Sequence, residues 1–258
     1  MSPTNATVRT DIADGIGRIV LNRPEAMNAI TVELGAALAD AFEALAASTE
    51  VHVVLVRGAG GNFSAGGDFA EVQRLREGGP RALEPLFANF RRACRLAGEI
   101  PQPVVAAVEG VAMAGGFELM QAVDVAIVRD DARLCDNHVN FGQVPGGGGS
   151  QRLAPLVGRQ RALGHLLGGE RLTGAEAAAW GLAFRSLPAA EFEAGVEHFV
   201  TTMAGRRRDA LATIKRLVRN GERLGVDAGL DQELAAVVEH IAGEAGGAGV
   251  AAFAGKGG

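Results

Sequence analysis

Cysteine is scarce in this sequence, which holds only Cys94 and Cys135 in 258 residues. Two cysteines are too few for a disulfide framework or for a zinc site built on cysteine. Long apolar runs are also missing, since no stretch approaches the roughly 18 uninterrupted apolar residues of a membrane-spanning helix. The first six residues lack the basic and apolar regions of a signal peptide. We therefore expect an intracellular, cytoplasmic protein that does not bind membranes.

The chain has no excess of basic residues. Its 25 lysines and arginines are outnumbered by 30 aspartates and glutamates, which gives a formal net charge of −5. A nucleic-acid-binding surface is usually basic, so we expect no nucleic-acid partner, although a local basic pocket for phosphates stays compatible with this charge. Because 48% of the residues are apolar, the chain is able to bury a sizeable core.

Several common nucleotide and nucleophile motifs are absent. Gly15-Ile16-Gly17 lacks the third glycine of a dinucleotide fingerprint, and a hairpin turn accounts for it. Neither of the glycine runs at 58–61 and 146–149 is followed by Lys-Ser or Lys-Thr, so the sequence contains no P-loop. Ser64 and Ser150 lie outside any Gly-x-Ser-x-Gly elbow, which leaves serine-hydrolase chemistry without support.

The first half of the chain alternates between predicted strands and helices. Residues 7–21 alternate apolar and polar side chains around Asp14-Gly15, which predicts a β-hairpin. Thr31 opens an apolar-periodic stretch that predicts a helix to about residue 47. Buried strands are predicted at 51–57, 103–108 and 123–128, and helices at 82–99 and 115–122. This alternation indicates an α/β protein with a largely parallel sheet.

After Pro145 the pattern becomes mainly helical. Helices are predicted at 150–157, 159–167, 174–180, 189–204, 208–223 and 227–243, with one short strand at 182–187. We expect an α/β core over residues 1–200 and a C-terminal helical part over residues 201–258. The Gly/Ala-rich tail from residue 242 onward is expected to be loosely held or ordered against a partner subunit.

Two glycine-rich segments follow two of the predicted strands. The first spans residues 62–68, and the second spans residues 110–119. Glycine allows close approach of the backbone to a ligand, so one main-chain N–H from each segment could converge on a single oxygen. Such a pair stabilises a developing oxyanion, as in a thioester enolate. The alternative is that these glycines only permit tight turns between strand and helix.

Five ordered blocks of the sequence resemble the enoyl-CoA hydratase/isomerase (crotonase) family. They are Asn22-Arg23-Pro24 with Asn28-Ala29, residues 63–68, residues 110–119, residues 145–153, and residues 172–177 followed by Gly181-Leu182. The resemblance runs from about residue 8 to the end of the chain. It implies a crotonase fold, which is a spiral of ββα units with a C-terminal helical trimerisation part. It further implies a homotrimer or homohexamer.

The resemblance also assigns roles to individual residues. The backbone N–H groups of Gly67 and Gly115 match the oxyanion-hole donors, and Glu118 matches the first catalytic glutamate of the hydratases. Six further residues match positions at which the family contacts coenzyme A, shapes its adenine pocket or reaches one of its phosphates. These six residues are Ala26, Ala65, Gly66, Asp68, Phe253 and Lys256. The chain ends in Gly257-Gly258 where the family has a basic finish, which weakens the match of the last two residues.

The sequence departs from the hydratase pattern at the second catalytic glutamate. Alignment backward from Pro145-Gly146 places His138 at that position. Histidine has an ordinary pKa near 6.5, so it can donate or accept a proton at neutral pH. Glu118 and His138 could therefore divide the base and acid roles. The histidine could equally mark a changed reaction, or serve only a structural purpose.

The resemblance implies hydration of a 2-enoyl-CoA to a 3-hydroxyacyl-CoA, with coenzyme A as part of the substrate and with no metal or redox cofactor. A double-bond isomerase, a C–C lyase and a thioester hydrolase of the same family fit a single carboxylate as well. A different class of protein also fits, namely a non-catalytic acyl-CoA-binding protein with a decayed site. The two glycine segments and Glu118 argue against that reading, whereas the lost second glutamate argues for it.

Overall fold

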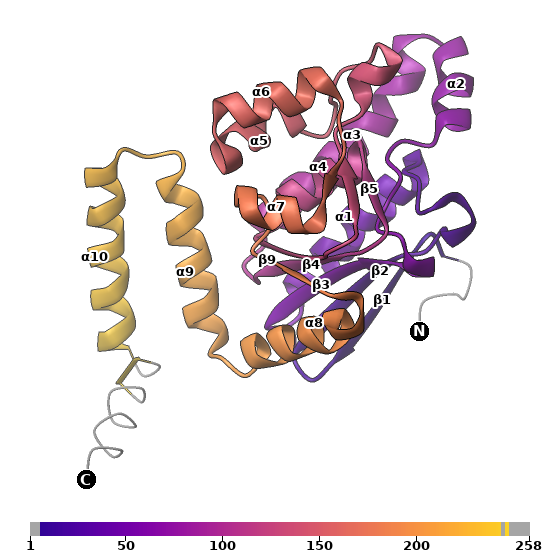
Figure 1. Ribbon diagram of the computed structural model, residues 1–258. Coiled ribbons are helices and arrows are strands. Elements are labelled where there is room, and N and C mark those ends of the chain that lie inside the picture. The colour runs from indigo at the N-terminus through magenta and orange to yellow at the C-terminus, as the bar shows by residue number, and fades with distance from the viewer. Residues whose placement is uncertain (1–5, 244–245, 248–258) are drawn as a thin grey trace.

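The structure is a computed structural model that describes residues 6–243 and 246–247 (Figure 1). Within this part of the chain, a six-stranded sheet has the order β1-β2-β3-β4-β6-β9. These strands are β1 (Val8–Ala13), β2 (Ile16–Leu21), β3 (Val53–Gly58), β4 (Val104–Val108), β6 (Val125–Arg129) and β9 (Arg185–Leu187). The first pair is antiparallel and all the others are parallel. A smaller sheet joins β5 (Val111–Met113), β7 (Arg133–Cys135) and β8 (Leu172–Thr173).

The β1–β2 hairpin forms because its turn residues tolerate left-handed backbone conformations. Asp14 and Gly15 have φ angles of 54° and 77°, which suits a tight two-residue turn between twisted antiparallel strands. The register pairs Ala13 with Ile16 directly across this turn. The sequence-based prediction of a hairpin at this position is therefore confirmed.

Helices cover both faces of the large sheet. Among the described residues the helices are α1 (Val32–Ala47), α2 (Phe69–Glu77), α3 (Pro80–Glu99), α4 (Gly115–Ala122), α5 (Gly149–Val157), α6 (Arg159–Gly168), α7 (Gly174–Trp180), α8 (Ala189–Ala204), α9 (Arg208–Gly221) and α10 (Val226–Ala242). Alternate side chains of a strand point to opposite faces, so β3 places Val54 in the core with α1 and α3, and Leu55 against α8. Both faces are buried, as is usual for parallel strands.

Most of the predicted elements are present in the structure. The α1 helix begins where the sequence predicts, because the Thr31 hydroxyl accepts a hydrogen bond from the Leu34 N–H and caps the first turn. The prediction omitted α2 and the three short strands of the small sheet, which are only 2 or 3 residues long. In such short segments the apolar pattern is too brief to separate a strand from a loop.

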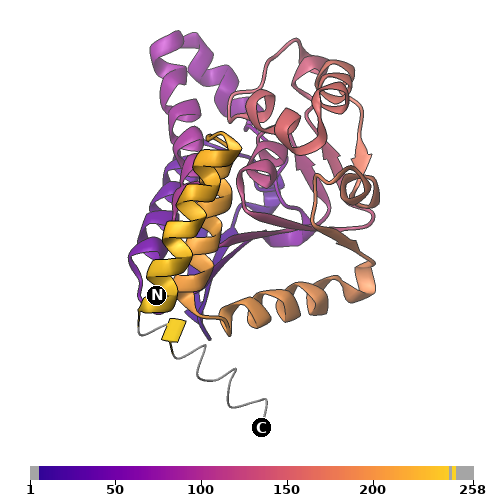
Figure 2. The ribbon, with the colours of Figure 1, turned by 90° about the vertical axis from the view of Figure 1, so that its left-hand side faces the viewer.

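The last two helices stand beside the core rather than on the sheet (Figures 1 and 2). The expected division at residue 200 falls within α8, whose Val196 and Val200 pack against the sheet. The helices that leave the core are α9 and α10, which contact each other. Their outward side chains include Ile214, Val218, Val226, Leu230, Leu234 and Val238, all exposed apolar residues. In the described part of the chain no helix is long and apolar enough to cross a membrane.

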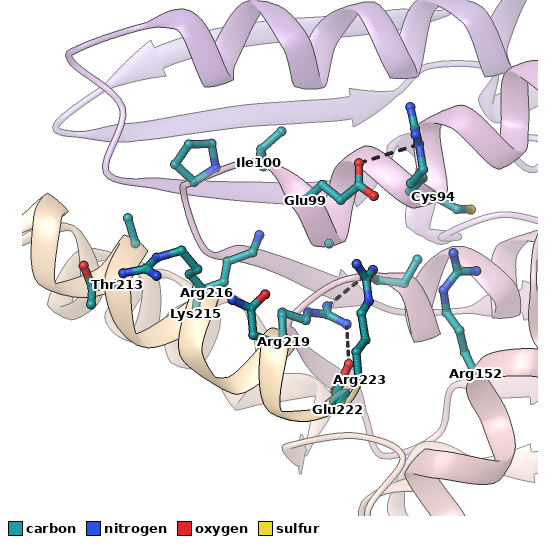
Figure 3. A pocket seen from close by; sticks show the side chains of 16 residues that line it. Cys94, Glu99, Ile100, Arg152, Thr213, Lys215, Arg216, Arg219, Glu222 and Arg223 are labelled. Carbon is teal, nitrogen blue, oxygen red and sulfur yellow. Dashed lines mark hydrogen bonds and ion pairs between the residues drawn. The ribbon is translucent and has the colours of Figure 1, made fainter. Parts of the chain in front are cut away.

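A buried ion-pair cluster fastens α9 to the core. Lys215 is only 6% exposed, and its Nζ lies 2.7 Å from Oδ2 of Asp124 and donates to the carbonyl oxygens of Ala97 and Gln102. Arg219 binds the other carboxylate oxygen of Asp124. Burial lowers the pKa of Lys215 below its ordinary value, although Asp124 acts in the opposite direction. Lys215 and Arg219 line a cavity of about 460 Å³ between α3 and α9 (Figure 3).

Candidate active site

The first glycine segment is held in place by Asn28, a fully buried residue with a φ angle of 56°. Its Nδ2 donates to the carbonyl oxygens of Ala59 and Asn62 at 2.9 and 2.8 Å, and its Oδ1 accepts from the Arg23 N–H. The Ser64 hydroxyl donates to the carbonyl oxygen of Asn28. Asn28, which belongs to the first of the five sequence blocks, thus fixes the position of the loop that carries Gly67.

The two glycine segments lie directly against each other. Ser64 exchanges backbone hydrogen bonds with Val111 and Met113 at 2.9 and 3.0 Å, which aligns the first segment with β5. A Cβ atom at Gly66 would come within 2.7 Å of the Ala114 Cβ, and Gly66 has a φ angle of 91°. A Cβ at Gly116 would collide with the carbonyl oxygen of Ser64. Glycine is therefore required at both positions for the segments to meet.

Gly67 and Gly115 line the same cavity, which has a volume of about 680 Å³. Gly115 is the first residue of α4, so its N–H has no acceptor within the helix. Among the described residues, neither this N–H nor that of Gly67 donates a hydrogen bond to the protein backbone. The preceding residue, Ala114, has φ and ψ angles of 45° and −115°, a strained conformation of the kind that often occurs at functional sites. Two unpaired donors and the N-terminus of α4 thus face one cavity.

Glu118 lies one helical turn after Gly115 and borders this cavity. It is 2% exposed, and its Oε1 accepts hydrogen bonds from the N–H groups of Gly147 and Gly149 at 2.7 and 2.8 Å. Arg152 holds the Gly147 loop in place by donating to the carbonyl oxygen of Gly147 at 2.6 Å. Burial raises the pKa of Glu118 above its ordinary value, although the two N–H groups and His138 act in the opposite direction.

His138 borders the same cavity from a 3-10 helix (His138–Phe141). Its Nδ1 lies 2.5 Å from Oδ1 of Asp136, which is 1% exposed. Burial of the ring disfavours the charged imidazolium, but the hydrogen bond and the charge of Asp136, together with the charge of Glu118, raise the pKa of His138 overall. Because Nδ1 faces Asp136, Nε2 is the ring nitrogen left for other partners.

Asp136 is the site residue that the sequence analysis missed. Its N–H donates to Nε2 of His165 at 3.0 Å, which also makes His165 a support of the site rather than an unrelated core residue. Its Oδ2 is buried and has no hydrogen-bond partner among the described residues. A Cβ atom at Gly149 would lie 2.7 Å from this oxygen and 3.3 Å from Oε1 of Glu118, so both carboxylates flank Gly149. The signal available in the sequence was the Asp-x-His spacing.

The other candidates differ in their relation to the cavity. Ala65 lines it, whereas Gly66 is buried at the contact between the two segments. Ala26 lies in a 3-10 helix (Pro24–Ala26). The Asp68 carboxylate caps α2 by accepting from the Glu71 N–H and pairs with Arg23 at 2.9 Å. Phe253 and Lys256 lie outside the described residues.

Comparisons with known proteins identify the family. The enoyl-CoA hydratase/isomerase family model matches residues 11–258. The chain is 33% identical to the hydroxycinnamoyl-CoA hydratase-lyase of Pseudomonas fluorescens, over 72% of this chain and 68% of that protein. It is 28% identical to the 1,2-epoxyphenylacetyl-CoA isomerase of Escherichia coli, over 88% and 87% of the two chains.

A solved structure of an enoyl-CoA hydratase from Polaromonas superposes with a TM-score of 0.92 at 29% identity, covering 96% of this chain and 97% of that one. The chain belongs to the enoyl-CoA hydratase/isomerase family. Its α/β core with a mixed sheet and a C-terminal helical part is the crotonase fold, so the predicted family and fold are confirmed. As a member of this family, the chain is an enzyme that processes acyl-CoA thioesters.

In this crotonase, the Asp136→Asn substitution is expected to lower the pKa of His138, because it removes the charge that stabilises the imidazolium while an oxygen stays available to Nδ1. Histidine NMR titration of the variant measures this pKa, with the exposed His198 as the internal control. A His138 titration that is unchanged by Asp136→Asn would contradict the pairing.

The same pairing gives a pH dependence of stability. Protonation of His138 stabilises the fold fully below the ordinary histidine pKa of about 6.5. This contribution is lost as the pH rises through the raised pKa of the folded protein. In Asp136→Asn, urea unfolding as a function of pH should show a smaller change of the unfolding free energy across this window.

Proposed function

We propose that the enzyme adds water to the double bond of a 2-enoyl-CoA and forms a 3-hydroxyacyl-CoA. The observation that carries this proposal is the convergence of four groups on one cavity. Two are the unpaired N–H groups of Gly67 and Gly115, and two are proton-transfer groups, the carboxylate of Glu118 and the imidazole of His138. An enolate needs oxygen stabilisation, and hydration needs one base and one acid.

The two N–H groups would hold the thioester oxygen. As the water oxygen bonds to the β-carbon, the electron pair of the double bond moves toward the carbonyl, and negative charge grows on the thioester oxygen. The N–H of Gly115 is also the first of α4, so the helix N-terminus adds a partial positive charge at this point. Removing one donor of such a pair typically slows a reaction by about 10²–10³-fold.

Glu118 would act as the base that takes a proton from the attacking water. Both backbone hydrogen bonds to this carboxylate involve Oε1, which fixes its orientation and leaves Oε2 for water. The raised pKa of Glu118 moves it toward neutrality, and a base is most effective when its pKa lies near the working pH. The proton taken from water stays on Glu118 until the product leaves.

His138 would act as the acid that delivers a proton to the α-carbon of the enolate. Its raised pKa favours the imidazolium near neutral pH, and Asp136 on Nδ1 leaves the Nε2–H as the proton to be transferred. The hydroxyl therefore ends on the β-carbon and the hydrogen on the α-carbon. Coenzyme A enters as part of the substrate, and the proposed steps use no metal ion or redox cofactor.

A double-bond isomerase or a C–C lyase is the second candidate. The names of the Pseudomonas and Escherichia coli relatives include a lyase and an isomerase, so similarity within the family does not separate these reactions. The specific observation in their favour is the histidine at position 138 in place of a second glutamate. Mass spectrometry of the products from a panel of 2-enoyl-CoAs separates these outcomes, because only hydration adds the mass of water. Binding of coenzyme A thioesters without turnover of any of them would favour the non-catalytic alternative.

The catalytic roles predict slower turnover in two variants. Glu118→Gln keeps the acceptor for the Gly147 and Gly149 N–H groups but cannot take a proton, so kcat should fall by about 10²–10⁴. His138→Ala should cost a comparable factor. In the wild type, the rate should fall as the pH rises through the pKa of His138, and fall on the acidic side as Glu118 becomes protonated.

The matched control is His198→Ala, which removes an exposed histidine of α8 and should leave the rate unchanged. The variant His138→Glu restores the two-carboxylate pattern and should keep hydratase activity. An unchanged rate and pH profile in His138→Ala would exclude the acid role. Glu118 would then act alone, and isomerase, lyase or hydrolase chemistry would replace hydration as the best account.

We also propose that the enzyme assembles as a homotrimer or as a dimer of trimers. The exposed apolar residues of α9 and α10 form a face that a partner subunit would cover, with Leu230 and Leu234 both more than half exposed. Burying such side chains stabilises an assembly by roughly 25 cal/mol per Å² of apolar surface. Light scattering at micromolar concentration should give three or six times the monomer mass, whereas a monomer would contradict the proposal.

A further inference from the structure

Aromatic residues are concentrated around the candidate active site. Only 5% of the chain is aromatic, yet four of its 11 phenylalanines line the 680 Å³ cavity, namely Phe69, Phe87, Phe90 and Phe141. They come from three separate segments, which are α2, α3 and the 3-10 helix that starts at His138. The ring pairs found among the described residues lie elsewhere, as between Phe184 and Phe199. Phe69, Phe87 and Phe141 are exposed and thus free to contact a ligand, whereas Phe90 is packed in the core at the cavity wall.

Two of these rings lie close to the proposed catalytic groups. A Cβ atom at Gly115 would lie 3.3 Å from the Phe90 ring, and a Cβ at Gly147 would overlap the same ring and lie 2.9 Å from Oε2 of Glu118. Phe90 therefore lies close both to Gly115 and to the loop that holds Glu118. A Cβ at Gly146 would lie 2.7 Å from the Phe87 ring. The glycines of this loop leave the space that the two rings occupy.

The aromatic wall formed by these rings continues along one face of α3. Phe90, Phe87 and Leu83 are spaced three and four residues apart, so they lie on the same side of the helix. Phe87 is 45% exposed, and Phe69 and Phe141, which line the same cavity from other segments, are 67% and 65% exposed. Large apolar side chains that stay exposed around a cavity are typical of a binding site. A group attached to the β-carbon of the substrate would cover them.

We propose that the acyl group of the substrate carries an aromatic ring on its β-carbon, so that the substrate class is the 3-aryl-2-propenoyl-CoA thioesters. This inference rests on the proposed hydration, which would place the new hydroxyl on the carbon that bears the ring. An aryl group offers faces and edges to Phe87, Phe90 and Phe141, and such ring pairs add to the free energy gained from burial alone. A straight alkyl chain of equal carbon number gains only the burial.

The test compares two saturated ligands that cannot react, 3-phenylpropanoyl-CoA and nonanoyl-CoA, which have the same number of acyl carbons. Isothermal titration calorimetry of the full-length protein gives the dissociation constant of each. We expect the aryl thioester to bind about 3- to 10-fold more tightly, the gain typical of one favourable ring pair. Equal affinity, or tighter binding of nonanoyl-CoA, would overturn the proposal.

The variant Phe87→Leu tests whether the ring of Phe87 contributes to the preference for the aryl thioester. Phe87 is nearly half exposed, so its replacement by leucine should leave the fold intact, and the preference for the aryl thioester should become smaller. The matched control is Phe184→Leu, which changes an exposed phenylalanine outside the cavity and should keep the preference. An undiminished preference in Phe87→Leu would show that the cavity wall does not select the ring, and would overturn the assignment.

Turnover experiments distinguish a failure of the proposed substrate class from a failure of the proposed hydration. Cinnamoyl-CoA and crotonyl-CoA are offered to the wild-type enzyme, and the products are followed by mass. Addition of water to crotonyl-CoA without the aryl binding preference would overturn the substrate class and leave hydration standing. The opposite result, preferential aryl binding with no water added to either thioester, would contradict hydration and leave the substrate class standing.

Discussion

The close packing of two glycine segments is the constraint on which the rest of the site depends. Gly66 and Gly116 lie so near the opposite segment that a single methyl group at either position would collide with it. This contact brings Gly67 and Gly115 to the wall of one cavity, although they are far apart in the sequence. Asn28 fixes one segment and the start of α4 fixes the other. The donors are therefore in place before a ligand arrives, which is what makes electrostatic stabilisation effective.

The charges around this site form a connected set. Asp136 and Glu118 are both buried carboxylates that flank Gly149, and His138 interacts with both of them. Two buried negative charges at short range are unfavourable unless a positive charge compensates them. An imidazolium at position 138 supplies that charge. The replacement of glutamate by histidine and the presence of Asp136 thus form one consistent arrangement.

The sequence predicts those features that depend on local patterns. The hairpin turn at Asp14-Gly15, the Thr31 cap and the helix from Gly115 all follow from neighbouring residues. The glycine segments and Glu118 were found because their spacing matches a family pattern. The role of Asp136 could not be found this way, because its meaning depends on the direction of its side chain and on His165, 29 residues away. The aromatic wall was missed for the same reason, since its rings come from three segments that only the fold brings together.

The central claim is that the N–H groups of Gly67 and Gly115 stabilise the thioester oxygen as it gains charge. The most direct test is the Gly67→Pro variant, because proline has no backbone N–H and Gly67 donates to no backbone group among the described residues. Circular dichroism establishes that the variant is folded, and calorimetry establishes that it binds the acyl-CoA. We predict that such a folded, binding variant loses kcat by about 10²–10³-fold. Full activity in the folded variant would contradict the account.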